Sequence, residues 1–378
     1  MCETLIVRSH KGSYTVHFDN RAFKELHSPQ PAQHHFLVDA TVARLYPRQL
    51  EGVLSARSVL VVEATEANKA LDKFQGYIEH LVSRSVRRGH MLVAIGGGIV
   101  QDIACFLGAT LFRGVEWSFY PTTLLAQADS CIGSKSSINV GSLKNIVGTF
   151  TPPTRVIVDA TVLETLESKD IRSGVGEMLK VHAIEGPTSF ARIAADYERV
   201  LAKGSVMNEY IRRSLEIKKG LIEDDEFDQG PRRVLNYGHS FGHAIESATS
   251  FSVPHGIAVT MGMDLANYVA VALGRTGVET FASMHPVLAA NCTGYERTAV
   301  PLERFLSALA KDKKNTDEEL TLILPDARAC ISLVQCRNDE RFRRVCAEYL
   351  QGGVLAGDVD AAPPISARPV TPGCSALG

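Results

Sequence analysis

Residues 90–112 read HMLVAIGGGIVQDIACFLGATLF, and this stretch decides the fold. The run MLVAI (91–95) predicts a buried strand, the triplet Gly96-Gly97-Gly98 a turn, and residues 99–111 a helix. Glycine lets the backbone come close to a ligand, and the exposed amides at a helix N-terminus favour a phosphate. The pattern is not GxGxxG, so the usual dinucleotide fingerprint is absent, and a tight turn without a ligand explains the triplet as well.

The same scheme occurs on both sides of this stretch. HHFLVDATVARLY (34–46) and SVLVVEATEANKALDKFQGYIEHLVSR (58–84) each place an apolar run before a polar turn and a helical pattern. WSFYPTTLLAQAD (117–129) and TRVIVDATVLETL (154–166) add strand-like runs, and TLIVRSHKGSYTVHF (4–18) predicts a hairpin. Strands that alternate with helices predict βαβ units, and hence an α/β domain with a mostly parallel sheet.

Beyond about Lys169 the strand patterns give way to long amphipathic helical ones. We therefore predict an α/β domain over residues 1–170 and a helical domain over residues 171–350. The late run ELTLILP (319–325) is predicted to be a lone strand or a buried segment. Residues 351–378 are rich in Gly, Ala and Pro, and we expect a disordered tail there.

Composition excludes several classes of protein. A formal net charge of -2 provides no global field for nucleic acid or for an anionic membrane. A run of about eighteen apolar residues, which a membrane span needs, is absent, and the first residues lack the layout of a signal peptide. The 8 cysteines show no CxxC pair or regular spacing. Reduced thiols in a cytoplasmic protein are therefore expected.

A second informative stretch is RVLNYGHSFGHAIESATSFSVPH (233–255). His239 and His243 are four residues apart, which places both imidazoles on one face of a helix, and His255 follows a short turn. Neutral imidazole is a common zinc ligand, and a catalytic zinc takes three protein ligands and keeps one position open. A further ligand would have to come from elsewhere in the chain. Histidines at this spacing also occur on helices that bind no metal, so the spacing alone leaves both interpretations open.

Other polar residues occupy positions typical of a site. Asp39 ends a predicted strand, where an acid accepts hydrogen bonds from ribose hydroxyls and favours NAD over NADP, although it could equally be a helix N-cap. Glu177 and Lys180 lie three apart in an apolar helix, where they either pair with each other or bind ligands, a metal for the acid and an anionic substrate for the lysine. The segment ADSCIGSKSSINVGSLKNIVGTF (128–150) contributes Asp129, Lys135, Lys144 and Asn145 to the expected ligand edge of the sheet, although lysines on a solvated loop are commonly only solvated.

Taken together, these motifs resemble 3-dehydroquinate synthase and the wider sugar phosphate cyclases up to about Pro325. The motifs that carry the resemblance occur in one order: GGGIVQD, FRG, PTTLLAQADS, GSKSSIN, KNIVGTF, GEMLK, DDEFDQGPRRVLNYGHSFGHAIE, HG and DKK. The resemblance implies an N-terminal Rossmann-like NAD-binding domain and a C-terminal helical metal-binding domain. It also implies that the metal and a sugar phosphate substrate lie in the cleft between them.

The resemblance also implies roles for individual residues. The metal, usually zinc and otherwise cobalt, matches Glu177, His239 and His255. The NAD contacts match Asp39, Glu66, Lys69, Gly97, Gly98, Asp102, Thr122, Thr123, Asp129, Lys135, Lys144 and Thr165. The substrate contacts match Asp129, Lys135, Lys144, Asn145, Lys180, Lys218, Arg232, Asn236 and His243, with Lys313 or Lys314 completing the phosphate site. Among these, Lys180, His243, Asn236 and Asp129 are the expected catalytic residues. Arg113 matches an arginine that reaches the substrate of a neighbouring subunit, which implies a homodimer.

Family members differ in substrate, and two residues favour a carboxylated one. Lys218 and Arg232 fill the positions that bind the substrate carboxylate of dehydroquinate synthase, and an arginine fork suits a planar carboxylate. We therefore expect 3-deoxy-arabino-heptulosonate 7-phosphate as substrate and 3-dehydroquinate as product. Departures from the family pattern at Ser134, Ser136, Ser142-Leu143 and Ile257 keep a related cyclase open, one acting on sedoheptulose 7-phosphate or glucose 6-phosphate. The motifs also leave room for a metal-dependent polyol dehydrogenase and for a non-catalytic protein of the same fold.

Overall fold

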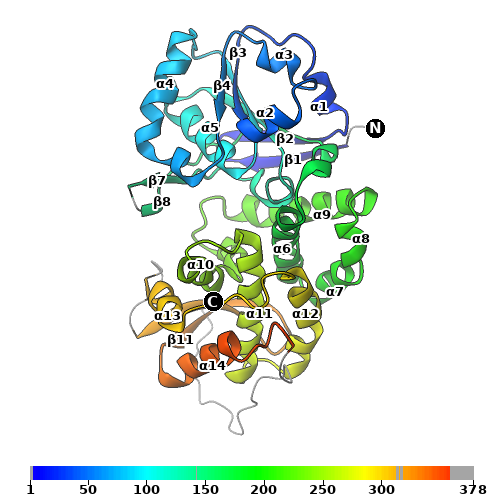
Figure 1. Cartoon of the computed structure of the whole chain (residues 1–378), viewed down its shortest axis with the longest axis vertical. Coiled ribbons are helices and arrows are strands. Elements are labelled where there is room, and N and C mark those ends of the chain that lie inside the picture. The colour runs from blue at the N-terminus through cyan, green and yellow to red at the C-terminus, as the bar shows by residue number, and fades with distance from the viewer. Residues whose placement is uncertain (1–2, 142, 312–314, 316–317, 358–378) are drawn as a thin grey trace. The chain divides into compact units, whose positions relative to one another are not determined.

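A seven-stranded sheet forms the centre of the first part of the chain, in the order β1-β2-β9-β6-β5-β3-β4. In this computed structural model, which describes residues 3–141, 143–311, 315 and 318–357, the chain divides into two compact units. Unit 1 comprises Met1–Glu167 and Lys203–Asp228, and unit 2 comprises Ser168–Ala202 and Gln229–Gly378. The strands of the sheet, drawn in blue to green in Figure 1, are β1 (Glu3–Ser9), β2 (Gly12–Phe18), β3 (His34–Asp39), β4 (Val59–Val62), β5 (Met91–Gly96), β6 (Glu116–Pro121) and β9 (Arg155–Val158).

The sheet confirms the α/β prediction. All neighbouring strands are parallel except β1 and β2, whose antiparallel register pairs Ser9 with Gly12 as the predicted hairpin requires. Strand β5 is buried from Leu92 to Gly96, because helices cover parallel sheets on both faces and such strands become continuous apolar runs. Helix α5 (Gly98–Thr110) follows β5 directly and packs back on the sheet.

Other helical elements of unit 1 connect these strands. They are α1 (Ala22–Glu25), α2 (Ala40–Leu45), α3 (Glu51–Leu54), η1 (Glu66–Lys69), η2 (Leu71–Lys73), α4 (Phe74–Ser83) and η3 (Leu111–Arg113). A short hairpin of β7 (Ile138–Val140) and β8 (Leu143–Val147) forms a separate two-stranded sheet.

Two of the predicted strand-like runs are strands only in part. Strand β6 ends at Pro121, and the Thr123 hydroxyl accepts a hydrogen bond from the Ala126 amide at 3.2 Å. Residues Ala126–Ser130 then form a turn of π-helix, η4, closed by the Cys131 amide, which donates to the Ala126 carbonyl at 3.0 Å. Strand β9 likewise ends at Val158. The Asp159 side chain then caps the 3-10 helix η5 (Ala160–Thr165) by accepting from the Thr161 amide at 3.0 Å.

Helix α9 (Ser205–Asp224) differs from the predicted domain boundary. The sequence division at residue 170 places it in the helical domain, whereas its contacts group residues 203–228 with unit 1. The buried face of α9, including Met207, Ile211 and Leu215, packs against β1 and η4. An amphipathic pattern shows that a helix buries one face but does not show against which neighbour.

Unit 2 is built around helix α11 (His255–Ala272), in which every residue from Gly256 to Ala272 is buried. A helix without a polar face must be surrounded, and α11 is in contact with α6, α10, α12 and α14. The helical elements of unit 2, drawn in green to red in Figure 1, are α6 (Ser168–Glu185), α7 (Pro187–Ala195), α8 (Tyr197–Leu201), η6 (Pro231–Asn236), α10 (His239–Ala248), α11, α12 (Val278–Asn291), α13 (Leu302–Ala310) and α14 (Glu340–Gln351).

The late strand is not alone. Strand β10 (Glu319–Pro325) pairs antiparallel with β11 (Ile331–Arg337), so the interpretation of a single strand is wrong while that of a buried run is confirmed. The tail predicted from residue 351 lies outside the described residues from 358 onward, and residues 352–357 form turns. Among the helices of the described ranges, none is long and apolar enough to cross a membrane. The predicted fold class, an α/β unit combined with a helical one, is confirmed.

Candidate functional site

The carboxyl ends of β3, β5 and β6 carry the residues predicted to bind a dinucleotide. Gly97 caps α5, and a Cβ atom added at Gly98 would meet nothing within 4 Å, so space is open beside the first turn of the helix. A Cβ atom on Gly97 would lie 3.0 Å from Thr123 Cγ2, so any larger residue would require the Thr123 side chain to shift. The neighbouring Thr122 amide donates to the Gly96 carbonyl at 2.9 Å and joins the end of β6 to this turn.

Asp39 lies at the end of β3 and is buried. Its Oδ1 accepts a hydrogen bond from the Thr41 amide at 2.7 Å, which confirms the interpretation as an N-cap of α2. Burial raises the pKa of the Asp39 carboxyl, opposed by the backbone amides that bond to it. Its role in holding a ribose stays a prediction, compatible with its position at the same edge of the sheet as the glycine turn.

Several predicted cofactor and substrate residues form one network in unit 1. Lys69 is buried, and its Nζ donates to Asp102 Oδ2 and to Asn145 Oδ1, both at 3.0 Å. Glu66 Oε1 lies 3.8 Å from the same Nζ. Burial raises the pKa of Asp102 to about 6, while the Lys69 ammonium acts in the opposite direction. The network thus joins η1, the first turn of α5 and the β7–β8 hairpin.

Two more predicted cations of unit 1 lie beside carboxylates. Lys218 Nζ donates to the Asp129 carbonyl at 2.6 Å and lies 3.1 Å from Asp129 Oδ1. Lys135 Nζ donates to Asp228 Oδ2 at 2.6 Å. Asp228 was not predicted, and no local pattern reveals a contact across 93 positions of the chain.

The remaining predicted residues of unit 1 are Thr165, Lys144 and Arg113. Thr165 Oγ1 shares a hydrogen bond with the Tyr46 hydroxyl at 2.9 Å, and Lys144 is exposed on β8. Arg113 is exposed, and its backbone is left-handed, with a φ of 65°. It follows the C-terminal end of α5, whereas the glycine turn precedes the N-terminal end of that helix. The structure therefore does not bring Arg113 to the dinucleotide edge of its own unit.

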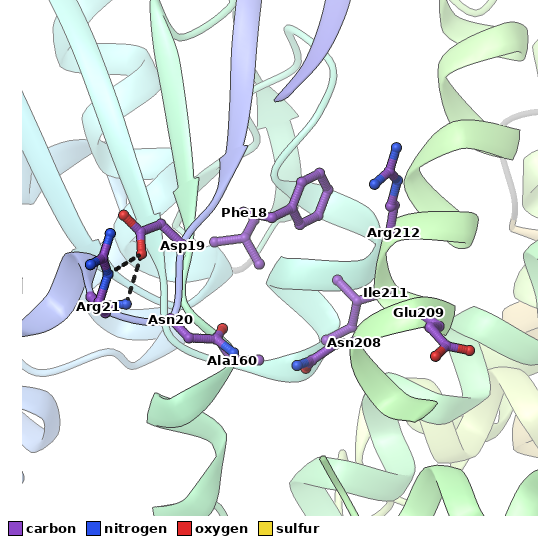
Figure 2. Close-up of a pocket in the computed structure, with 10 residues that line it drawn as sticks. Phe18, Asp19, Asn20, Arg21, Ala160, Asn208, Glu209, Ile211 and Arg212 are labelled. Carbon is purple, nitrogen blue, oxygen red and sulfur yellow. Dashed lines mark hydrogen bonds and ion pairs between the residues drawn. The ribbon is translucent and has the colours of Figure 1, made fainter. Parts of the chain in front are cut away.

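A hollow of about 660 Å³ in unit 1 lies elsewhere and is lined by no predicted residue. Figure 2 shows the Phe18 ring directed toward Arg212, whose guanidinium carbon lies 6.0 Å from the ring centroid, and the pair of Asp19 with Arg21. The two arginines that line this hollow already have acidic neighbours, because Arg21 pairs with Asp19 and Arg212 pairs with Glu216 at 3.0 Å. The lining residues are Phe18, Asp19, Asn20, Arg21, Val158, Ala160, Asn208, Glu209, Ile211 and Arg212.

Unit 2 brings the predicted metal ligands together. Glu177 on α6 is buried, and its Oε1 lies 3.7 Å from His239 Nε2 and 3.4 Å from His255 Nε2. His243 joins them, since the ligand atoms of His239, His243 and His255 all lie within 4.8 Å of one another. His239 and His243 lie on α10, and His255 begins α11. The i,i+4 spacing and the short turn therefore bring the three imidazoles together, as the sequence predicted.

The charges of this cluster fit a cation. Within the described residues, neither carboxylate oxygen of Glu177 accepts a well-aligned hydrogen bond, although Lys180 Nζ lies 2.5 Å from Oε2. Burial alone would raise the pKa of Glu177, but Lys180 and two imidazoles hold it well below its usual range. Burial would lower the pKa of His255, but the carboxylates of Glu177 and Glu246 raise it to about 10. A metal takes deprotonated ligands and would replace such a shared proton, so this donor set fits a divalent ion.

Sequence reasoning missed Glu246. Its Oε2 lies 3.2 Å from His255 Nδ1, the nitrogen turned away from Glu177. The signal was present, because Glu246 follows His239 by seven residues and therefore lies on the same face of α10. Arg232, which is buried, and Asn236, whose side chain donates to the Arg233 carbonyl at 3.1 Å, lie on η6 just before α10. Lys313 and Lys314 lie outside the described residues.

Comparison with known families covers most of the chain. Residues 59–173 match the model described as 3-dehydroquinate synthase N-terminal, and residues 174–315 match the one described as 3-dehydroquinate synthase C-terminal. The boundary between the two matches falls within α6, close to the point where the chain first passes from unit 1 to unit 2.

Individual proteins agree with this result. A 3-dehydroquinate synthase from Cereibacter sphaeroides is 36% identical over 299 residues, which are 76% of this chain and 81% of that protein. Among solved structures, a 2-deoxy-scyllo-inosose synthase complexed with carbaglucose-6-phosphate, NAD+ and Co2+ has a TM-score of 0.79 at 20% identity, with 92% of this chain and 100% of that chain covered. A 2-epi-5-epi-valiolone synthase from Streptomyces hygroscopicus with NAD+ and Zn2+ bound has a TM-score of 0.79 at 23% identity, with 90% and 97% covered. At these identities the two structures establish the fold only.

Proposed function

Because this chain belongs to the 3-dehydroquinate synthase family and is a sugar phosphate cyclase, a phosphate-eliminating carbon–oxygen lyase, we propose that it converts 3-deoxy-arabino-heptulosonate 7-phosphate to 3-dehydroquinate. The observation that carries the proposal is the buried carboxylate of Glu177, which faces the imidazoles of His239 and His255 and the ammonium of Lys180. A structural ion pair would not need two further imidazoles at the same oxygen. A bound divalent metal does.

The proposed cofactors are NAD, held at the glycine turn of unit 1, and Zn²⁺ or Co²⁺, held by the Glu177 cluster of unit 2. When bound, NAD would take up and return a hydride, and the metal would polarise the substrate oxygen that is oxidised and reduced. The two solved relatives, with NAD+ and with Co2+ or Zn2+ respectively, support both assignments.

The remaining steps fall to side chains of the chain itself. Lys135, Lys144, Asn145 and His243 would hold the phosphate, whose departure develops negative charge that cations and amide donors stabilise. The phosphate itself could accept the proton that is removed from the carbon next to the transient ketone. Lys180, Asn236 and Asp129 would orient the ring hydroxyls by hydrogen bonds. The protein would therefore act mainly by positioning and by electrostatic stabilisation.

Lys218 and Arg232 support a carboxylated substrate. Both side chains are buried, at 6% exposure each. The guanidinium fork matches a carboxylate in a bidentate way, which a neutral sugar phosphate could not offer at that end. The identity of 31–36% to proteins named 3-dehydroquinate synthase points in the same direction.

A related cyclase is the second candidate, because Ser134, Ser136 and Ile257 depart from the usual family residues. Ser134 and Ser136 are buried, and Ile257 directly follows the start of α11. Sedoheptulose 7-phosphate or glucose 6-phosphate would then be the substrate. A polyol dehydrogenase of the same fold would have no use for the lysines at the phosphate site.

We also propose a cytoplasmic homodimer. The described cysteines are all free, and the exposed Arg113 is available to a second copy of the chain.

The experiment is a comparison of three sugar phosphates. The protein is incubated with NAD, Zn²⁺ or Co²⁺ and each candidate, while phosphate release and NADH absorbance are recorded together. Phosphate release with the heptulosonate and without accumulation of NADH supports the proposal. Release with only the uncarboxylated sugars would assign the related cyclase instead, and sustained NADH would assign a dehydrogenase.

One substitution tests the carboxylate argument. Arg232→Ala is expected to weaken the transition-state binding of the heptulosonate by roughly 2–5 kcal/mol, because it leaves a substrate charge unpaired in a desolvated site. The measurement is kcat/KM for phosphate release, and the adjacent Arg233→Ala serves as the matched control. An unchanged kcat/KM in Arg232→Ala would remove the case for a carboxylate pocket.

A further inference from the structure

One buried side chain lies between the two predicted ligand sites of unit 1, although the sequence motifs assign it no role. Asn139 on β7 is buried at 5% exposure. Its Nδ2 donates to the Glu66 carboxylate at 2.8 Å and to the Glu66 carbonyl at 3.1 Å, while its Oδ1 accepts from the Asn145 amide at 2.9 Å. Glu66 belongs to the predicted cofactor contacts and Asn145 to the predicted phosphate contacts. We propose that Asn139 is a positioning residue that fixes the phosphate-binding hairpin to the cofactor site.

The orientation of the Asn139 amide follows from its partners. Carboxylate and carbonyl oxygens can only accept, so the group facing Glu66 must be the NH₂. A backbone amide can only donate, so the group facing Asn145 must be the oxygen. Both ends of the side chain are therefore matched, and reversing it would set two acceptors against each other on one side and two donors on the other. No other amide orientation satisfies this contact set.

Asn145 needs such support because its backbone is left-handed, with a φ of 55°. Asparagine tolerates this conformation better than most residues but does not prefer it. Asn139 holds the backbone amide of Asn145, and Lys69 Nζ holds its side-chain oxygen at 3.0 Å. The strained residue is thereby fixed at two points, one of them from β7 and the other from η1.

The base of the hairpin is anchored in the same way. The Asp102 carboxylate on α5 accepts from the Ser137 amide at 2.9 Å, and the backbone of Asn139 forms a bridge with that of Ala70, directly after η1. Beyond this base, β8 is exposed over Leu143–Ile146. The exposed strand that carries Lys144 and Asn145 is therefore positioned by its backbone pairing with β7 and by the buried polar bridge at Asn139.

This inference rests on the proposed function for the roles of Glu66 and Asn145, but its test includes a readout that needs no substrate. In Asn139→Asp the acceptor for the Asn145 amide remains, while a carboxylate replaces the donor that faces Glu66. In the double variant Asn139→Asp/Glu66→Gln the donor and the acceptor exchange sides, so the hydrogen bond between the two side chains can form again, while the bond to the carbonyl of residue 66 stays lost. Measurements at about pH 8 keep both carboxylates ionised in the single variant.

Two quantities are measured: hydrogen exchange of residues 143–147 and the KM for the sugar phosphate at saturating NAD. In Asn139→Asp we expect faster exchange and a KM raised about 10- to 100-fold, because loss of positioning of this order carries such a factor. The double variant should bring both the exchange and the KM part of the way back to the wild-type values, because one of the two bonds to residue 66 is restored. Glu66→Gln alone keeps an acceptor for Asn139 and should leave the exchange of residues 143–147 unchanged.

Exchange in strand β5 serves as the internal control. Faster exchange in both β5 and residues 143–147 of Asn139→Asp would indicate a general loss of stability and overturn the positioning role. Exchange and KM within twofold of the wild type would overturn it too, as would a double variant that fails to recover the exchange. If the wild type turns over none of the sugar phosphates, the proposed function fails, whereas the exchange data still decide whether Asn139 fixes the hairpin.

Discussion

At the scale of single residues, the histidines of this chain differ according to what faces their second ring nitrogen. His255 directs Nε2 toward Glu177 and Nδ1 toward Glu246, at 3.4 and 3.2 Å. His239 has only the Tyr237 carbonyl beside its Nδ1, at 3.4 Å. A carboxylate behind an imidazole fixes the tautomer and raises the basicity of the ligand nitrogen. Glu246 would therefore orient His255 as one of the proposed metal ligands.

Glu246→Ala should weaken divalent metal binding about 10- to 100-fold, as losses of such supporting carboxylates do. The affinity for Zn²⁺ is measured by competition with a chromogenic chelator, without substrate or NAD. Glu246→Gln keeps an oxygen acceptor for Nδ1–H and should lose less affinity than the alanine variant. Equal affinity of the alanine variant and the wild type would show that His255 needs no support from Glu246.

A second pair of histidines makes a prediction about pH. His35 is buried in β3, where its Nδ1 faces the Ser58 hydroxyl at 2.7 Å and its Nε2 faces His90 Nδ1 at 2.8 Å. Burial, followed by the nearby His90, His34, Arg57 and His80, lowers the pKa of His35 to about 4. The unfolded chain, with a pKa near 6.5, then binds more protons than the folded one between pH 6.5 and 4. The stability that His35 contributes is present above pH 6.5 and is lost as the pH falls through this window.

The loss should approach ~3 kcal/mol at the lower end of the window, since one pKa unit corresponds to about 1.4 kcal/mol. The free energy of unfolding in urea is compared between the wild type and His35→Gln from pH 7.5 to 4.5. The difference between them should shrink as the pH falls. A difference that stays constant would mean that His35 does not titrate differently in the two states.

At this scale the sequence could predict contacts between residues that are close in the chain, but not contacts that depend on the tertiary fold. The grouping of His239, His243 and His255 follows from helix spacing and one short turn. Asp228, which meets Lys135 across 93 positions, depends on the tertiary fold, and no local pattern contains it. Asn139 lies in a motif that was recognised, yet its role depends on three elements meeting at one point.

At the scale of helices and strands, two glycines explain why Glu177 and His255 are neighbours. Gly176 precedes Glu177 on α6, and Gly256 follows His255 on α11. A Cβ atom on Gly256 would lie 1.8 Å from the Ser173 carbonyl oxygen, and one on Gly176 would lie 2.2 Å from the Gly256 carbonyl oxygen. The two helices therefore approach so closely only because neither has a side chain at this crossing.

Gly256→Ala should destabilise unit 2 by roughly 1–3 kcal/mol or more, because the added methyl group meets backbone that cannot move aside cheaply. It should also weaken metal binding, since α6 and α11 carry adjacent ligands. Thermal unfolding and chelator competition measure the two effects. The matched control is Gly220→Ala on α9, where an added Cβ meets nothing within 4 Å. That change should be neutral or stabilise by about 0.5–1 kcal/mol, and a loss of stability equal to that of Gly256→Ala would contradict the crossing argument.

The elements themselves were predicted unevenly. The β1–β2 hairpin and the strand, turn and helix around the glycine triplet follow from patterns of ten to twenty residues, and the structure confirms them. Strand β11 was missed because ISLVQCR has a weak alternation, and it becomes a strand by pairing with the strongly apolar β10. Helix α9 was recognised as a helix and placed in the predicted helical domain, whereas its contacts group it with unit 1, since its sequence defines a buried face and not a partner.

At the scale of the whole molecule, the two proposed cofactors depend on different units. The predicted NAD residues belong to unit 1, and the described members of the metal cluster belong to unit 2. Removal of the metal with a chelator should therefore abolish phosphate release but leave the dissociation constant of NAD unchanged within about twofold, as expected for sites without shared residues. Zn²⁺ or Co²⁺ should restore the activity.

The control for this experiment is NAD binding to the chelated protein after the metal is restored. Binding is followed by quenching of the fluorescence of Trp117, which is buried on β6 within unit 1. Loss of NAD binding together with the metal would show that the two sites are coupled and would contradict the prediction.

The chain passes between its two units three times, after Glu167, Ala202 and Asp228. During translation the ribosome releases all strands of the large sheet first, then a piece of the helical part, and only afterwards the helix that packs against β1. The contacts of unit 1 are therefore complete only after Asp228 has been synthesised. Genetic recombination at any single point would transfer an incomplete fragment of one unit, so we expect both halves of this enzyme to be inherited as one piece.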